Sequence, residues 1–224
     1  DDNKKLCLTS GEIIKMTDRM TLMFEAEDLE QASPATVSRV GMIFCEERNI
    51  GWRPLRKVWL DALPENIHPY RQKLSDLFEW LLPPLTFFVL KRCTIPSPVT
   101  RQEMSYSVMR LMTCLLVDQE DWAADMVRIL ENCFIFSIIW SVGACTDTQG
   151  RATFDAYLRK VLSGDLAADE AHLDFLSKNR DYNVKRKSAV PMPEEGLMYD
   201  YRFEPKSMAW VEWMNVAAKH AIAA

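Results

Sequence analysis

The sequence lacks the glycine spacing of a nucleotide-binding loop. A P-loop needs Gly-x4-Gly-Lys-Ser/Thr, so that successive backbone N–H groups can wrap the phosphates. The seven glycines form neither this pattern nor Gly-x-Gly-x-x-Gly; they stand at positions 11, 41, 51, 143, 150, 164 and 196. The chain by itself therefore contains no complete nucleotide cradle.

Metal-ligand patterns are missing as well. The six cysteines form no Cys-x-x-Cys or Cys-x-x-His pair, and the three histidines, at positions 68, 172 and 220, are isolated from one another. Five of the six cysteines have apolar neighbours, which predicts small buried side chains in a reducing compartment. The histidines are predicted to be surface residues. No metal site is expected.

Charge of one sign and long apolar runs are also absent. The formal net charge is -5, and both signs are interspersed, so no basic field would attract nucleic acid or an anionic membrane. The longest apolar runs, 81–90 and 134–145, fall short of the roughly 20 residues that a membrane span requires. They predict buried helices of a soluble chain. The first residues show no signal-peptide layout and no initiating Met, so we expect a fragment of a longer protein.

The first 50 residues predict a small α/β part. Residues 5–8 and 12–15 flank Thr9-Ser10-Gly11, a polar connection that favours a β-hairpin. The apolar runs 20–25 and 40–45 predict buried strands. Between them, Ser33 suits an N-cap and Pro34 suits the first helical position, which predicts a helix of one to two turns.

Residues 51–164 predict a helical bundle. The expected helices are 53–62, 68–93 with a bend at Pro83-Pro84, 98–117, 121–144 and 149–162. In the third, apolar residues recur at steps of three and four along one helix face; they are Met104, Val108, Leu111, Met112, Leu115 and Leu116. Four tryptophans of the bundle are assigned to packing: Trp59, Trp80, Trp122 and Trp140.

The last 60 residues divide into two segments. Residues 165–195 pass from an acidic to a basic run, which predicts a solvated linker with a short helix near 168–178. Residues 196–224 contain alternating large side chains and predict a strand or hairpin. The fold class is thus mostly α with a small α/β part. From the residues alone, the function stays open.

Several longer motifs resemble dynein heavy chains. They are Leu6-Cys-Leu-Thr-Ser-Gly-Glu-Ile-Ile14, Phe24-Glu25 and Ala32-Ser-Pro-Ala-Thr-Val-Ser-Arg-Val-Gly-Met42, which look like the second AAA+ module of the motor ring. Gly51-Trp52-Arg-Pro-Leu55 and Phe136-Ser-Ile-Ile-Trp140-Ser-Val-Gly143 resemble the helical lid, and Pro193-Glu-Glu-Gly-Leu-Met-Tyr199-Asp-Tyr201 resembles the start of the third module. One departure is Val40, where the family usually has Cys; it keeps a small apolar residue there.

The resemblance implies a domain plan. Residues 1–50 would be the C-terminal part of the AAA+ large subdomain, with strands and a β-hairpin, and 51–164 the helical lid subdomain. Residues 165–195 would be a linker, and 196–224 the start of the next module. The hairpin at 6–14 would match an insert that faces the mechanical linker, or it is an ordinary edge hairpin.

The resemblance also implies site residues. Arg39 matches the arginine finger that reaches the ATP site of the neighbouring module; read alone, it is a solvated cation at a helix end. Glu25 matches a sensor position in the module's own pocket; read alone, it is a solvated carboxylate. Arg101, near the start of a lid helix, is within reach of the same pocket by its position, but no family motif surrounds it and it is not counted among the site residues. ATP or ADP with Mg²⁺ would be bound by the intact ring, because the Walker residues are expected upstream, and this fragment alone should be inactive.

The implied parent protein is an ATP-driven microtubule motor. Its expected partners are the neighbouring AAA+ modules and linker, microtubules, and dynein intermediate and light chains, with no nucleic acid or membrane. The expected location is the cytoskeleton, and the axoneme of a cilium or flagellum. The alternative is a non-enzymatic helical adaptor whose apolar faces bind partner helices.

Overall fold

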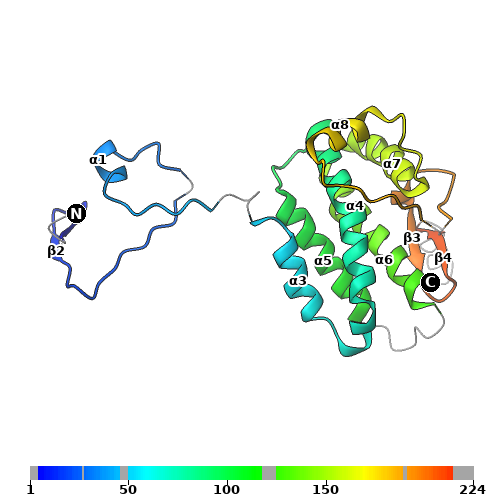
Figure 1. Cartoon of the computed structure of the whole chain (residues 1–224), viewed down its shortest axis with the longest axis horizontal. Helices are drawn as coiled ribbons and strands as arrows, with labels where there is room; N and C mark the ends of the chain where they lie inside the picture. Colours follow the sequence, from blue (N-terminus) through cyan, green and yellow to red (C-terminus); the bar gives the residue numbers. More distant parts are fainter. Residues whose placement is uncertain (1–4, 27, 46–49, 118–124, 189–190, 214–224) are drawn as a thin grey trace, which may run out of the picture. The chain divides into compact units, whose positions relative to one another are not determined.

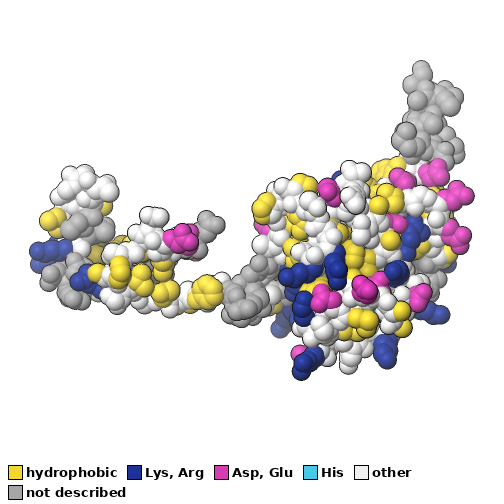
Figure 2. All heavy atoms as spheres, turned by 90° about the horizontal axis from the view of Figure 1, so that it is seen from above, with side chains coloured by type: hydrophobic (Ala, Val, Ile, Leu, Met, Phe, Trp, Pro, Cys, Tyr) yellow, Lys and Arg dark blue, Asp and Glu magenta, His cyan; other side chains and the backbone are white. Residues whose placement is uncertain are grey.

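The computed structural model describes residues 5–26, 28–45, 50–117, 125–188 and 191–213. The chain divides into two compact units, Asp1–Glu46 and Glu47–Ala224. The larger unit is a helical bundle with one two-stranded sheet (Figure 1). On the face shown in Figure 2, its acidic and basic side chains are mixed, as the composition predicts.

The smaller unit contains the predicted hairpin and short helix. Strands β1 (Lys5–Cys7) and β2 (Ile13–Lys15) pair antiparallel, and Gly11 in their connection has φ of 86°. This left-handed conformation is open to glycine without a steric penalty. Helix α1 (Pro34–Val37) begins where predicted, because the Ser33 hydroxyl accepts a hydrogen bond from the Thr36 N–H at 3.2 Å.

The strands expected at 20–25 and 40–45 are a wrong prediction. Both segments lack regular structure, and their large side chains are exposed, Phe24 by 75% and Ile43 by 87%. A buried strand needs neighbours that satisfy its backbone donors and acceptors. Within the described part of this unit, only β1 and β2 are paired, so the two apolar runs have no ladder to join.

Five helices form the bundle of the larger unit. They are α3 (Arg53–Asp61), α4 (Arg71–Arg92), α5 (Arg101–Val117), α6 (Met126–Ser141) and α7 (Thr148–Ser163). A 3-10 helix, η1 (Glu65–Tyr70), precedes α4, and another, η2 (Gly143–Cys145), follows α6. All five predicted helices are present with slightly shifted ends; residues 121–124 of the fourth lie outside the described residues. Helix α4 packs against both α6 and α7, and its residues Leu77 and Leu81 are fully buried.

Helix α4 is assigned as continuous through Pro83 and Pro84. Proline has no N–H, so Pro84 cannot donate to the Trp80 carbonyl one turn earlier. The Tyr182 hydroxyl supplies a hydrogen bond to this carbonyl instead, at 2.8 Å. The proline therefore leaves a buried acceptor on the helix, and a distant part of the chain satisfies it.

The segment that contains Tyr182 is not a solvated linker, contrary to prediction. Residues 179–188, here called the strap, follow helix α8 (Glu170–Lys178) and lie against the bundle. The Arg186 guanidinium lies 5.0 Å from the centre of the Trp80 ring, and the Ser188 N–H donates to the Leu162 carbonyl at 2.7 Å. In α8, the predicted short helix, Phe175 is 1% exposed.

The carboxylate of Glu131 joins the strap to two helices. From α6 it accepts hydrogen bonds from Lys73 of α4 at 2.6 Å, from Arg186 at 2.9 Å and from the Ser188 hydroxyl at 2.9 Å. Burial acts to raise the pKa of Glu131, but the Lys73 and Ser188 hydrogen bonds and the two cations outweigh it, so the pKa is lowered. The buried carboxylate is therefore held ionised.

The C-terminal segment forms the predicted hairpin. A 3-10 turn, η3 (Met198–Asp200), leads into β3 (Tyr201–Glu204), which pairs antiparallel with β4 (Ala209–Glu212). The hairpin packs on α6, and the Trp210 indole N–H donates to the Asn132 side-chain oxygen at 2.8 Å. It thus belongs to the same compact unit as the bundle.

Among the described residues, the segment Met126–Cys145 is long and apolar enough to cross a membrane by length and composition alone. No span is expected from the sequence, because the uninterrupted apolar run 134–145 is shorter than the roughly 20 residues that a membrane span requires. However, 72% of its most apolar window is buried inside the bundle, as for the core helix of a globular domain.

The hydrogen bond from the Tyr182 hydroxyl to the Trp80 carbonyl gives a testable prediction. Tyr182→Phe should destabilise the chain by about 1–3 kcal/mol, because the Trp80 carbonyl is left buried without a partner. In a Pro84→Ala background, residue 84 has an N–H for this carbonyl, so the same change should cost clearly less. Urea unfolding of the four proteins measures this coupling, and equal costs in both backgrounds would contradict it.

The Glu131 carboxylate makes a second prediction. Glu131→Gln should destabilise the chain by about 2–4 kcal/mol at pH 7, because Lys73 and Arg186 lose their buried counter-charge. Since the native pKa of Glu131 is lowered, its contribution is present at neutral pH and is lost as the pH falls through that pKa. The difference in free energy of unfolding between the Glu131→Gln variant and the parent chain should therefore become smaller at acid pH. Glu65→Gln, which changes an exposed carboxylate, is the control. A difference in free energy of unfolding that stays the same down to acid pH would contradict the conclusion that Glu131 is ionised in the folded chain.

Candidate functional site

Arg39 lies at the surface of the smaller unit, just after helix α1. Its backbone N–H donates to the Thr36 carbonyl at 3.1 Å, which continues the turn begun by the Ser33 cap. The residue is exposed. A guanidinium keeps its charge at all ordinary pH values and offers a planar fork of donors, so an exposed Arg39 can bind phosphate or carboxylate oxygens of another part of a larger assembly.

Glu25 is also exposed, in an extended segment and not at the end of a strand. Within the described residues, Glu25 and Arg39 form no ion pair with each other, so the structure does not bring the two predicted site residues together. Arg101 begins helix α5 in the other unit and is exposed too.

The beginning of the bundle carries a cluster of arginines. Arg53 contacts both oxygens of the Glu79 carboxylate, at 2.8 and 2.7 Å, and Arg56 contacts one of them at 2.7 Å. Both guanidinium groups lie 5.1 Å from the centre of the Trp52 ring. Burial acts to raise the pKa of Glu79, but these two arginines lower it overall. The motif Gly-Trp-Arg-Pro-Leu thus fastens α3 to α4.

A shallow basic cleft of about 550 Å³ lies between α3 and α4. Its charged lining residues are Arg53, Arg56, Lys57, Asp61 and Arg71. Arg71 already donates to the Asp61 carbonyl at 3.1 Å and lies 3.7 Å from its carboxylate. Much of the positive charge is therefore used within the bundle, in structural ion pairs.

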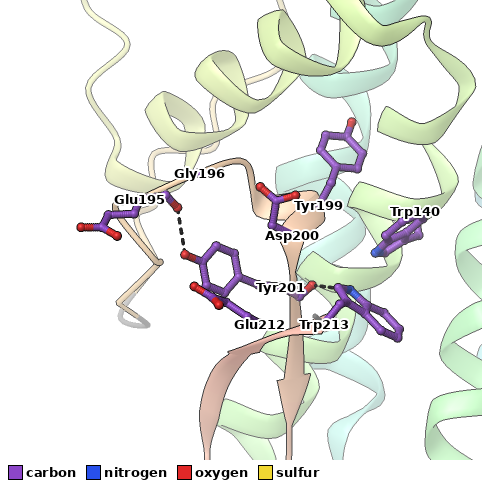
Figure 3. Close-up of a pocket in the computed structure, with 8 residues that line it drawn as sticks. All are labelled: Trp140, Glu195, Gly196, Tyr199, Asp200, Tyr201, Glu212 and Trp213. Atoms are coloured by element: carbon purple, nitrogen blue, oxygen red, sulfur yellow. Dashed lines mark hydrogen bonds between the residues drawn. The ribbon is translucent and has the colours of Figure 1, made fainter. Parts of the chain in front are cut away.

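A second pocket, of about 630 Å³, lies where the C-terminal hairpin meets α6 (Figure 3). Four aromatic residues, three carboxylates and a glycine line it: Trp140, Tyr199, Tyr201, Trp213, Glu195, Asp200, Glu212 and Gly196. Trp140, which is predicted to be a packing residue, is 37% exposed, and Trp213 is 43% exposed. The signal available in the sequence was the alternation of carboxylates and aromatics over 194–201.

Buried contacts hold the loop of this pocket in place. Asp155 of α7 is 5% exposed and accepts hydrogen bonds from the Met198 N–H and the Arg159 side chain, each at 2.7 Å. Arg159 also donates to the carbonyls of Pro193 and Gly196. Gly143 leaves room for the Tyr199 ring, since a Cβ there would overlap the Tyr199 hydroxyl. The pocket therefore rests on the packed bundle.

His172 was predicted at the surface, and this is wrong: it is 8% exposed. Its Nδ1 lies 3.2 Å from the Tyr157 hydroxyl, and burial lowers its pKa against the opposing effect of Asp169. His68 is half-buried, and His220 lies outside the described residues. The described part of the chain contains no group of three His, Cys, Asp or Glu side chains that fits a metal ion.

The prediction of buried cysteines holds only in part. Cys133 is buried, which raises its pKa to about 12, and Cys93 is half-buried with a pKa raised to about 11, mainly by burial. Cys145 is also half-buried, whereas Cys45 and Cys114 are exposed. The burial of Cys7 lies outside the described side chains.

Comparison with known proteins shows which family the bundle belongs to. The family model for the dynein heavy chain AAA lid domain matches residues 74–215, which include α8, the strap and the C-terminal hairpin. Mouse dynein axonemal heavy chain 12 is 40% identical over 219 residues, 95% of this chain and 7% of that protein. Human dynein axonemal heavy chains 3 and 1 are 35% and 36% identical, over 98% and 97% of this chain and 5% of each relative. The chain thus spans less than a tenth of these relatives.

Proposed function

Because this chain belongs to the dynein heavy chain family and carries its AAA lid domain, we propose that it is the C-terminal part of the second AAA+ module and the start of the third. The order of the motifs supports this position: the Ser-Pro-Ala-Thr-Val-Ser-Arg segment precedes the lid, and Pro-Glu-Glu-Gly-Leu-Met-Tyr-Asp-Tyr follows it. In this proposal the hairpin at 201–212 packs on the lid and leads the chain toward the third module.

Arg39 is the proposed arginine finger. It would approach ATP held by the preceding module and stabilise the negative charge that develops on the transferred phosphoryl group. A finger of this kind is worth roughly 10³–10⁵ in rate in well-measured nucleotide hydrolases. The observation that carries the proposal is its exposure directly after a capped helical turn, which fixes the backbone and leaves the side chain available to a neighbour.

Glu25 is the proposed sensor of the module's own nucleotide pocket. The residues of this chain do not fit ATP and Mg²⁺ by themselves, since the glycine spacing of a phosphate loop is absent and no metal-binding group occurs among the described residues. Nucleotide and metal are therefore proposed to be bound by other parts of the ring. The contribution of this chain is the finger, the sensor and the lid.

The lid is the proposed mechanical element. Helices α3 to α7 share one core, so closure of the ring on nucleotide would move them together and transmit the motion to neighbouring modules and the linker. We propose that the parent protein is an ATP-driven microtubule motor of the axoneme, supported by the axonemal relatives. The family match argues against a free-standing helical adaptor.

The finger role predicts a separation of rate from affinity. In the full motor, Arg39→Ala should reduce microtubule-stimulated ATP turnover by roughly 10³-fold and change nucleotide affinity much less, because the guanidinium acts on the transition state. Arg19→Ala, another exposed arginine of the same unit, is the matched control. Equal losses in turnover and affinity would argue against transition-state stabilisation.

Because the sequence lacks the glycine spacing of a P-loop, we predict that the 224-residue chain does not bind ATP specifically. Calorimetric titration with ATP and Mg²⁺ should give only heats of dilution. Tight, saturable binding would mean that the chain contains a nucleotide site of a kind other than a P-loop.

A further inference from the structure

Helix α1, which precedes Arg39, is held by its own hydrogen bonds and not by a hydrophobic core. None of the described side chains of the smaller unit is buried, and α1 is only 4 residues long. A helix of this length is marginal in water, because fixing the first turn costs more conformational entropy than one hydrogen bond returns. Local capping groups must therefore stabilise the turn from which Arg39 projects.

Ser33 supplies the capping group at the start of this turn. Its backbone is extended, with φ of -66° and ψ of 150°, and its hydroxyl oxygen accepts a hydrogen bond from the Thr36 N–H at 3.2 Å. The Ser33 carbonyl accepts the Val37 N–H at 3.0 Å. Pro34 follows in the first turn, and its ring fixes φ near the helical value. Ser33 and Pro34 thus favour the helical turn before any tertiary contact is made.

Thr36 connects the cap to Arg39. The hydroxyl groups of Ser33 and Thr36 lie 2.9 Å apart, within hydrogen-bonding distance. The Thr36 carbonyl in turn accepts the Arg39 backbone N–H at 3.1 Å. A continuous path of hydrogen bonds therefore runs from the Ser33 hydroxyl, through Thr36, to the backbone of Arg39. Loss of the Ser33 hydroxyl would loosen the backbone from which the Arg39 side chain projects.

Ser38 offers a comparison within the same turn. It directly precedes Arg39, and its hydroxyl donates to the Ala35 carbonyl at 3.0 Å. Ala35 is exposed, so water can donate to this carbonyl when the hydroxyl is removed. The N-cap is different, because its acceptor stabilises the first turn, where the cost of starting a helix falls. Two serines of one turn therefore have the same side chain and different structural roles.

We propose that Ser33 and Thr36 are positioning residues for Arg39, and that they hold the turn from which its guanidinium reaches the transferred phosphoryl group. This rests on the proposed role of Arg39 as the arginine finger. Neither hydroxyl has to touch the nucleotide, because both act through the backbone of Arg39. A guanidinium on a loosened turn spends less time in the productive position, and a misplacement on the order of 1 Å is enough to cost about 10²-fold in rate.

The 224-residue chain tests the structural half of the proposal without any activity. Amide hydrogen exchange at Thr36 and Arg39, followed by NMR, should be roughly fivefold faster in Ser33→Ala, the scale of losing one helix N-cap. Ser38→Ala is the matched control and should leave both exchange rates unchanged. Unchanged exchange in Ser33→Ala would overturn the proposal, because the turn would then not depend on its cap.

The full motor tests the functional half. Ser33→Ala should lower microtubule-stimulated turnover at saturating ATP roughly fivefold and leave nucleotide affinity nearly unchanged, because the cap acts only through the finger. Thr36→Val, which keeps the branched shape and removes the hydroxyl, should lower turnover in the same direction. Ser33→Asn should restore turnover, since Asn caps a helix as well as Ser does. Ser38→Ala should leave turnover unchanged.

An Arg39→Ala background separates positioning from any other role of Ser33. In that background Ser33→Ala should cause no further loss, because the group that it positions is gone. A further fivefold loss there, an equal loss in Ser38→Ala, or no recovery in Ser33→Asn would overturn the positioning role. Normal turnover of Ser33→Ala beside an impaired Arg39→Ala would overturn it too, and would leave the finger role intact. Normal turnover of Arg39→Ala would instead overturn the finger role, and the positioning role with it.

Discussion

The ionised carboxylate of Glu131 is the contact on which the arrangement of the lid depends. It is 6% exposed, and it brings together α6, Lys73 of α4 and two residues of the strap. A buried charge is tolerated only when it is paired and fully hydrogen-bonded, so these partners must all be in place when the domain folds. The strap in turn carries the chain from α8 to the loop that forms the aromatic pocket.

The hydrogen bond from the Tyr182 hydroxyl to the Trp80 carbonyl also holds the strap against α4. A proline inside a helix normally costs stability because it leaves a carbonyl unsatisfied. Here that carbonyl serves as the acceptor for the strap. With Arg186 above the Trp80 ring, one turn of α4 binds the strap through a backbone atom and an aromatic face. The proline that removes one hydrogen bond within α4 thus leaves the acceptor to which the strap binds.

The sequence predicted the helices well because their signals are local. Ser33 caps α1 and Pro34 stands in its first turn, as these two residues predict from the sequence alone. The strap was missed because its partners, Trp80 and Glu131, are distant in sequence and a mixed run of charges resembles a solvated linker. The strands at 20–25 and 40–45 were predicted from apolar content alone, and apolar content does not supply a partner strand.

The candidate site was predictable only by resemblance. Nothing in the residue types around Arg39 or Glu25 distinguishes them from solvated surface charges, and the structure shows both as exposed. The family match supports the setting in which they would act, although their roles stay predictions. For the aromatic pocket, the motif at residues 193–201 is visible in the sequence. Only the folded hairpin, however, brings Trp140 and Trp213 beside the carboxylates of this motif.

The central claim is that this chain completes the nucleotide site of a neighbouring AAA+ module. The most direct measurement is a structure of the assembled motor ring with ADP and a γ-phosphate analogue bound. The account predicts that the Arg39 guanidinium lies within hydrogen-bonding distance of the analogue held by the preceding module. An Arg39 side chain that points into solvent, far from any nucleotide, would contradict it.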